Sequence, residues 1–331
     1  MATISDVAAR AGVSPATVSR VLNGKSTVDP GLAERVVAAA RELDYRPNAF
    51  ARNLRRQAST VLALIIADVE NPFFTAIARG VEDVAQASGY SVVLCNADDD
   101  PAKERRYVDV ALAERAAGVI ISPAGVQTDV GALLEQSIPV VAVDRPLAAP
   151  AGDTVLVDTR LAARQATLHL VEAGYHRIAC VTGPSGVRTA DDRLAGYRDG
   201  LRAAKRRSSA ALVRRADYRA AGAQRATRDL FDRPERPDAL LVANNAMAIG
   251  ALQALAELGL RPGTEVGVVS FDDAPWAPLV VPSLTVVSQP AYEMGMVAAQ
   301  LLLARIADGS REPTTTTLSA QLIERDSSRR G

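Results

Sequence analysis

The hydrophobic and polar positions divide the chain into two regions with different periods. Up to about residue 45, apolar residues recur at the spacing of short helices, beginning with Ile4, Val7, Ala8 and Ala11. From residue 61 onward, short apolar runs alternate with helix-length amphipathic stretches. The pattern predicts a small helical domain followed by a larger α/β region of roughly 270 residues.

The second region reads as strands that are each followed by a helix. Apolar runs occupy 61–67, 91–95, 118–122, 139–143, 177–181, 239–243 and 266–271. Helix candidates lie near 74–88, 101–115, 160–174, 190–204, 245–259 and 291–307. Strands this short and fully apolar indicate parallel sheets covered by helices on both faces.

The first region carries the local signals of a helix-turn-helix. Thr3 can cap a first helix with Asp6 three positions on, and Gly12 supplies a tight turn. Ser14 before Pro15 then opens a second helix that extends to about Asn23. The spacing places four residues on the outer face of this helix near its N-terminus: Pro15, Ala16, Thr17 and Arg20. A recognition helix presents this end to the base edges. A third helix begins at Asp29-Pro30.

Charge favours DNA binding over a three-helix domain that binds nothing. Residues 1–60 contain nine Arg or Lys and five Asp or Glu, a net charge of +4. The whole chain has 38 of each kind, so the remainder carries −4. A basic end on a mildly acidic body suits a phosphate-contacting surface at that end alone.

A short basic segment follows the third helix. Tyr45 leads into Arg46-Pro47-Asn48, and Asn48 can cap a helix of about two turns that would be marginal by itself in water. Ala51 and Leu54 stand among arginines that include Arg55. Apolar residues beside arginines are the composition of a minor-groove wedge, and a flexible basic linker is an equal alternative.

Polar and aromatic residues follow the predicted strands, where ligands bind in open parallel sheets. Amides, carboxylates, arginine forks and aromatic faces together suit a polyol such as a sugar. Taken singly, the aromatics could be core residues, the Asp-Arg pair a surface ion pair, and Asn or Asp loop caps. The candidate effector-binding residues are Asn71, Phe73, Phe74, Asp144, Arg145, Arg193, Tyr218, Asn244, Asp272 and Gln289.

Residues 3–54 resemble, without a gap, the DNA-binding headpiece and hinge of the lactose-repressor family of bacterial transcription regulators. The resemblance puts Pro15, Ala16 and Arg20 at base-reading positions, and Ala51 and Leu54 at hinge positions that enter the minor groove. It implies a dimer that binds a palindromic operator on double-stranded DNA. The expected DNA-binding residues are Thr3, Ser14, Pro15, Ala16, Thr17, Arg20, Asn23, Tyr45, Asn48, Ala51, Leu54 and Arg55.

From about Val61 to Arg325 the chain resembles the periplasmic sugar-binding fold that this family uses as a sensor. The expected organisation is a headpiece at 1–46, a hinge helix and linker at 47–60, and a sensor at 61–331. The sensor would divide into an N-subdomain (about 61–158 and 290–318) and a C-subdomain (about 159–289 and 319–331). The polar set is similar to that of ribose-binding proteins, so we expect a repressor of sugar-utilisation genes released by ribose or another pentose. A co-repressor-type regulator of a nucleoside, purine or sugar phosphate is the alternative.

An enzyme and an exported sugar-binding protein are the competing classes. The chain has no G-x-G-x-x-G after its first strand, no phosphate-binding loop and no G-x-S-x-G motif. Its start has no basic-then-apolar export signal, and no segment reaches about 18 apolar residues. Cys95 and Cys180 fall in predicted strands and are expected as buried free thiols. We therefore expect a cytoplasmic homodimeric regulator with no cofactor, no metal and no membrane contact.

Overall fold

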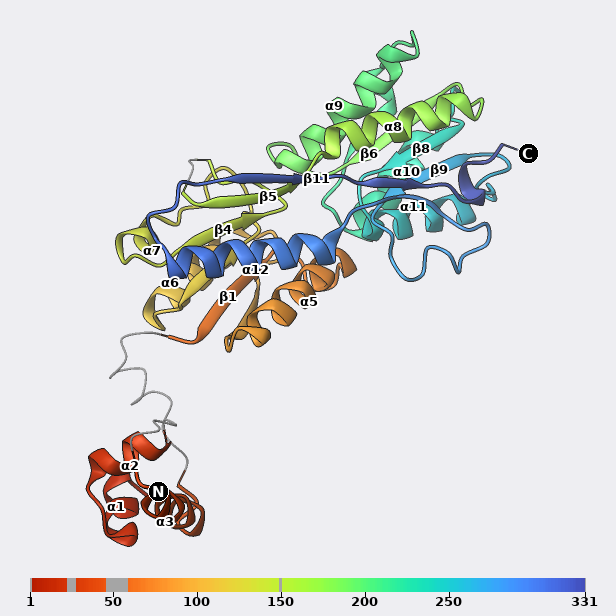
Figure 1. Ribbon diagram of the computed structural model, residues 1–331. Coiled ribbons are helices and arrows are strands. Elements are labelled where there is room, and N and C mark those ends of the chain that lie inside the picture. Colours follow the sequence, from red (N-terminus) through yellow and green to blue (C-terminus); the bar gives the residue numbers. More distant parts are fainter. Residues whose placement is uncertain (1, 23–27, 46–58, 149–150, 331) are drawn as a thin grey trace. The chain divides into compact units, whose positions relative to one another are not determined.

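The computed structural model describes residues 2–22, 28–45, 59–148 and 151–330 (Figure 1). The chain divides into two compact units, Met1–Ser59 and Thr60–Gly331, which we describe separately. Among the described residues, no helix has both the length and the apolar character needed to cross a membrane.

The first unit contains the three predicted helices, α1 (Ile4–Ala11), α2 (Pro15–Leu22) and α3 (Pro30–Glu42). Thr3 and Asp6 form the predicted capping box, and Ser14 accepts a hydrogen bond from the Thr17 amide at 3.1 Å. Gly12 ends α1 in the left-handed conformation, at φ 64°, which glycine adopts without strain. The helices enclose a small core that includes Val7, Ala8, Val18, Val36 and Ala39.

The second unit contains two six-stranded sheets. The first sheet has the order β11-β5-β4-β3-β1-β2, with β1 (Val61–Ile66), β2 (Ser91–Asn96), β3 (Gly118–Ile121), β4 (Val140–Val143), β5 (Asp153–Val157) and β11 (Thr315–Leu318). The second has the order β12-β10-β9-β8-β6-β7, with β6 (Ile178–Thr182), β7 (Val213–Arg215), β8 (Ala239–Val242), β9 (Gly267–Phe271), β10 (Thr285–Ser288) and β12 (Gln321–Ile323). The pairing is parallel except between β10 and β12.

Helices cover both faces of each sheet, as fully apolar parallel strands require. On the first sheet these are α5 (Pro72–Ala87) and α12 (Ala291–Ala307) on one face, and α6 (Pro101–Ala113) and α7 (Gly131–Glu135) on the other. On the second sheet they are α8 (Thr159–Glu172) and α9 (Arg188–Ala203) on one face, and α10 (Ala220–Phe231) and α11 (Asn245–Glu257) on the other. Two short 3₁₀ helices, η1 (Ala210–Leu212) and η2 (Asp326–Ser328), complete the unit.

Alternate residues of each strand enter opposite cores. Leu62 and Leu64 of β1 pack with α5 and α12, whereas Ala63 and Ile65 pack with α6 and α7. The predicted fold class, a helix-turn-helix followed by a pair of parallel-sheet subdomains, is therefore confirmed, and the hinge helix predicted to begin at residue 47 lies outside the described residues. The chain passes between the two sheets after β5, after β10 and between β11 and β12.

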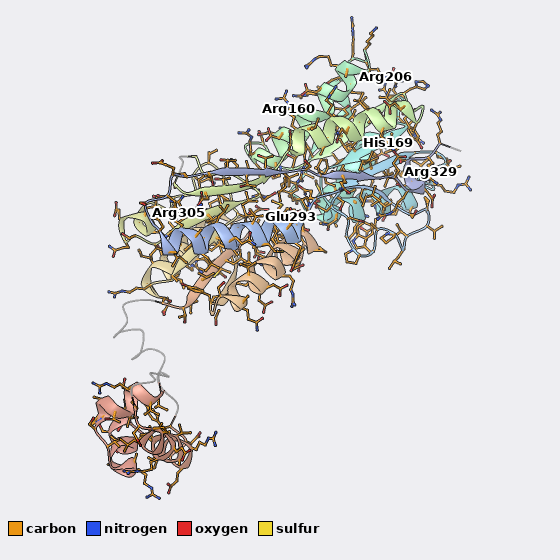
Figure 2. All side chains as sticks on the ribbon, in the orientation of Figure 1. Arg160, His169, Arg206, Glu293, Arg305 and Arg329 are labelled. Carbon is orange, nitrogen blue, oxygen red and sulfur yellow. The ribbon has the colours of Figure 1, made fainter. Side chains whose placement is uncertain are left out.

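The end of α12 is tied to the first sheet by a buried charge. Arg305 donates to Asp153 of β5 at 2.9 Å, and its position near the end of α12 is visible in Figure 2. Asp153 is fully buried, and burial alone would raise its pKa. Hydrogen bonds from Arg305 and Thr314 outweigh that effect, so the pKa of Asp153 lies below its usual range. The pair therefore holds the end of α12 against the start of β5.

Two glycines allow α5 and α12 to approach closely. A Cβ at Gly80 would lie 2.1 Å from the Tyr292 carbonyl oxygen, and a Cβ at Gly295 would lie 2.1 Å from the Ile77 carbonyl oxygen. Neither backbone oxygen can move without shifting a helix.

Gly295→Ala should therefore destabilise the second unit by about 1–3 kcal/mol, because the added methyl group overpacks the contact between α12 and α5. Urea denaturation followed by circular dichroism measures this change. Gly309→Ala is the matched control, since its Cβ would have no neighbour within 4 Å. Equal stability of the two variants would contradict the close packing.

Candidate functional site

A pocket lies where the carboxyl ends of strands from both sheets face each other. The space not filled by atoms there, which includes open solvent, is about 360 Å³. Its lining residues are Asp68, Asn71, Phe73, Phe74, Asp99, Asp144, Arg145, Thr189, Arg193, Tyr218, Asn244 and Asp272. Nine of the ten residues predicted for an effector site are brought together here.

Gln289 is the predicted residue that does not line this pocket. It lines an adjoining groove instead, and its Nε2 donates to Asp272 Oδ1 at 2.7 Å. Gln289 therefore reaches the pocket only through the Asp272 carboxylate, which it helps to orient.

Asparagines at the starts of α5 and α11 serve as caps and pocket walls at once. Asn71 accepts from the Phe73 amide at 2.9 Å, and Asn244 accepts from the Met247 amide at 2.8 Å. The Asn245 side chain donates to Asn71 Oδ1 at 2.7 Å and so connects the second sheet's helices to the first sheet's. The loop-cap interpretation of Asn244 is thus correct, and it coincides with a place in the pocket.

Four non-glycine pocket residues have a left-handed backbone. Asp99, Asp144, Tyr218 and Asp272 have φ angles of 54°, 67°, 60° and 72°. Asp144 and Asp272 follow directly after β4 and β9, so the turn of the backbone directs each carboxylate at the sheet edge. This conformation costs about 1–2 kcal/mol for a residue with a Cβ, and such strain concentrates at functional sites.

Buried charges dominate the electrostatics of the pocket. Arg145 donates to Asp99 at 2.6 Å and to the Pro123 carbonyl at 3.2 Å, and its Nε lies 3.4 Å from Asp144. Burial raises the pKa of Asp144 although Arg145 opposes the shift, and burial likewise raises the pKa of Asp272 against the field of Arg193. Both carboxylates are therefore held in a desolvated state that a hydrogen-bonding ligand would relieve.

The second arginine and the aromatic rings shape the remaining walls. The Arg193 guanidinium lies 4.4 Å from the centre of the Phe271 ring and donates to the Ala243 carbonyl. Phe73 and Phe74 pack edge to face at 5.1 Å. The Arg193 Nε is buried without a hydrogen-bond partner among the described residues, which leaves it as a donor for a bound molecule.

Sequence reasoning missed four residues at this site. Asp68 and Asp99 follow β1 and β2 and could have been found by the rule that located Asn71. Thr189 lies 3.3 Å from the Tyr218 hydroxyl, and Asn245 bridges Asn71 and Asp272. In the sequence, Asn245 directly follows the predicted Asn244 and Thr189 lies four positions before the predicted Arg193, and neither carries a further signal.

The headpiece candidates are placed in part. Ser14, Pro15, Ala16 and Arg20 are exposed, Thr17 and Tyr45 are half-buried, and Thr3 caps α1. The other five predicted DNA-binding residues lie outside the described residues: Asn23, Asn48, Ala51, Leu54 and Arg55.

Comparison with known proteins identifies the class. Residues 3–48 match the lacI family of bacterial regulatory proteins, and residues 167–328 match the periplasmic binding protein-like domain. The ribose operon repressor of Halalkalibacterium halodurans is 37% identical, over 100% of this chain and 98% of that protein. The chain belongs to the lacI family and is a DNA-binding transcriptional regulator.

Two solved structures show the same architecture. The lac repressor dimer bound to operator and the anti-inducer ONPF has a TM-score of 0.88 and 29% identity, covering 99% of each chain. A LacI family transcriptional regulator from Enterococcus faecium with bound ribose has a TM-score of 0.73 and 25% identity, covering 81% of this chain and 98% of that one.

Asp144→Asn should weaken effector binding about 10- to 100-fold through loss of a charged hydrogen-bond acceptor. Without ligand, the variant should also become more stable relative to wild type as pH rises above about 4. The raised pKa of Asp144 means that the folded state holds the extra proton, so wild-type stability falls with pH in that range. The asparagine removes this loss.

Denaturation at a series of pH values, with Asp109→Asn as an exposed control, measures the difference. A variant whose stability relative to wild type is independent of pH would contradict the burial of a charged Asp144.

Proposed function

We propose that this chain is a cytoplasmic repressor of sugar-utilisation genes, without catalytic activity, that ribose or another pentose releases from its operator. The observation that carries the proposal is the pocket itself, where aromatic faces, two guanidiniums, amides and carboxylates converge in a buried space. Such a set matches the hydroxyls and the C–H faces of a sugar. The name of the ribose operon repressor and the ribose-bound relative support the choice of pentose.

The charge of the pocket supports a neutral effector. Four carboxylates line it, from Asp68, Asp99, Asp144 and Asp272, against the two guanidiniums of Arg145 and Arg193. A phosphate group buried there would face more negative than positive groups, which is unfavourable at low dielectric. This disfavours a sugar phosphate, while a nucleoside or purine stays a competing ligand.

We further propose that α2 reads the major groove and that two chains bind a palindrome. Pro15, Ala16 and Arg20 are exposed on α2, and Arg20 is the member of this group that can donate two hydrogen bonds to guanine. A twofold dimer matches the symmetry of such a site. The second unit offers apolar surface for a dimer contact at its edge strand β2, where Val93 and Leu94 are 49% and 44% exposed.

Ribose should bind the purified protein and lower its affinity for an operator fragment selected from random DNA. Calorimetry measures the first effect and fluorescence anisotropy the second, with other pentoses, hexoses, adenine, adenosine and ribose 5-phosphate as comparisons. If none of the sugars gives a heat of binding, the sugar site is refuted. Binding of ribose without a change in operator affinity would refute its role as inducer.

Arg20→Ala should cost about 1–3 kcal/mol per half-site and relax specificity at one base pair, because the bidentate contact is lost. Anisotropy titrations against single-base operator variants measure this pattern. Arg41→Ala removes an equal charge from α3 and is the control. A uniform weakening across all operator variants would instead make Arg20 a phosphate contact.

A further inference from the structure

Arg219 reaches from the second sheet's half of the sensor to the first sheet's half. It directly follows Tyr218 and precedes α10. Its Nη1 donates to Asp68 Oδ2 at 2.6 Å, and Asp68 lies just after β1. Glu70 lies 3.8 Å from the same nitrogen, and Asp98, after β2, lies 3.7 Å from Nη2. A single guanidinium thus faces three carboxylates across the cleft.

Asp68 depends on this contact more than Asp98 does. Asp68 is 6% exposed, and among the described ion pairs its cation is Arg219. Asp98 also pairs with Lys103, which lies in the same half. Opening the cleft would therefore remove the cation from Asp68 but leave Asp98 paired, so the Asp68–Arg219 contact is specific to the closed arrangement.

The position of Arg219 links this contact to the pocket. Arg219 does not line the pocket, whereas both Asp68 and the preceding Tyr218 do. The Tyr218 carbonyl accepts from Asn244 Nδ2 at 3.2 Å, and the Tyr218 ring lies 5.9 Å from the Arg145 guanidinium of the opposite half. A shift of Arg219 would therefore move the aromatic wall of the pocket.

We propose that Arg219 is a closing latch: a positioning residue that joins the two halves of the sensor through Asp68 and thereby sets effector sensitivity. The second part of this inference rests on the proposed function. The latch raises the fraction of sensor molecules that are closed without ligand, and the apparent affinity for an effector that binds the closed state rises in proportion. By linkage, the effector strengthens the latch equally.

An ordinary surface ion pair would behave differently. Arg228 of α10 pairs with Glu257 of α11, and both belong to the second sheet's half. The arginine side chains are similarly exposed, 37% for Arg219 and 48% for Arg228. Arg228→Gln therefore removes an arginine ion pair from the same helix region without affecting closure, which makes it the matched control.

Closure can be measured without any effector. Val126 and Ser185 are exposed in the loops after β3 and β6, on opposite sides of the cleft. Spin labels at Val126→Cys and Ser185→Cys report their separation, because Cys95 and Cys180 are buried. Arg219→Gln should shift the distance distribution of the full-length protein to longer values, and Arg228→Gln should leave it unchanged. An unchanged distribution for Arg219→Gln overturns the latch.

Effector affinity gives the second readout. Arg219→Gln should raise the calorimetric Kd for ribose about five- to thirtyfold, since the pair is partly desolvated at the rim. Arg219→Lys should recover part of the loss. In an Asp68→Asn background, Arg219→Gln should have little further effect. Additive losses would show that Arg219 acts elsewhere, and overturn the pairing.

The two readouts separate failure of the latch from failure of the proposed effector. If the wild type binds no pentose, the proposed function is wrong, and the spin-label distances still decide whether Arg219 closes the sensor. If ribose binds but its affinity in Arg219→Gln matches that in Arg228→Gln, the latch does not set sensitivity. Rising salt should weaken ribose binding to the wild type more than to Arg219→Gln.

Discussion

The sensor depends on one constraint, which is the burial of carboxylates where two sheet edges meet. Parallel strands place their carboxyl ends at one edge, so Asp68, Asp99, Asp144 and Asp272 collect in the same small space. Desolvation disfavours each charge unless donors face it. Arg145 from the first half and Arg193 from the second provide part of this compensation, and Arg219 adds to it at Asp68 from across the cleft.

The surrounding architecture supplies rigidity where the compensation is incomplete. Asp144 and Asp272 are held in left-handed conformations directly after buried strands, and Asn71 and Asn244 are held as helix caps. Turning the Asn71 or Asn244 side chain away would break the cap of α5 or α11. The pocket therefore keeps unmet hydrogen-bonding capacity, which a polyol can satisfy and which a collapsed core would have lost.

The sequence predicted the parts of this structure that have a strong periodic signal. All seven fully apolar runs are strands, and all six long amphipathic stretches are helices. The weaker elements were missed: α7 has five residues, β7 and β12 have three each, β5 and β11 are only partly buried, and the Arg-rich α10 has few large apolar residues. At the site, the rule that ligands follow strands located nine pocket residues. It could not locate Arg219, because its role depends on which carboxylate the fold places opposite it.

A charged contact suits the rim of such a cleft better than an apolar one. Apolar surfaces that meet on closing would stabilise the closed state by about 25 cal/mol for each Å² buried. When the cleft opens, water does not replace the lost apolar contacts with favourable interactions. An exposed ion pair exchanges its partner for water and contributes about 0–1 kcal/mol. The Arg219–Asp68 pair, which is exposed on one side and buried on the other, falls between these limits. A contact of this size does not outweigh the contacts of one small ligand, so the ligand can still decide which state is populated.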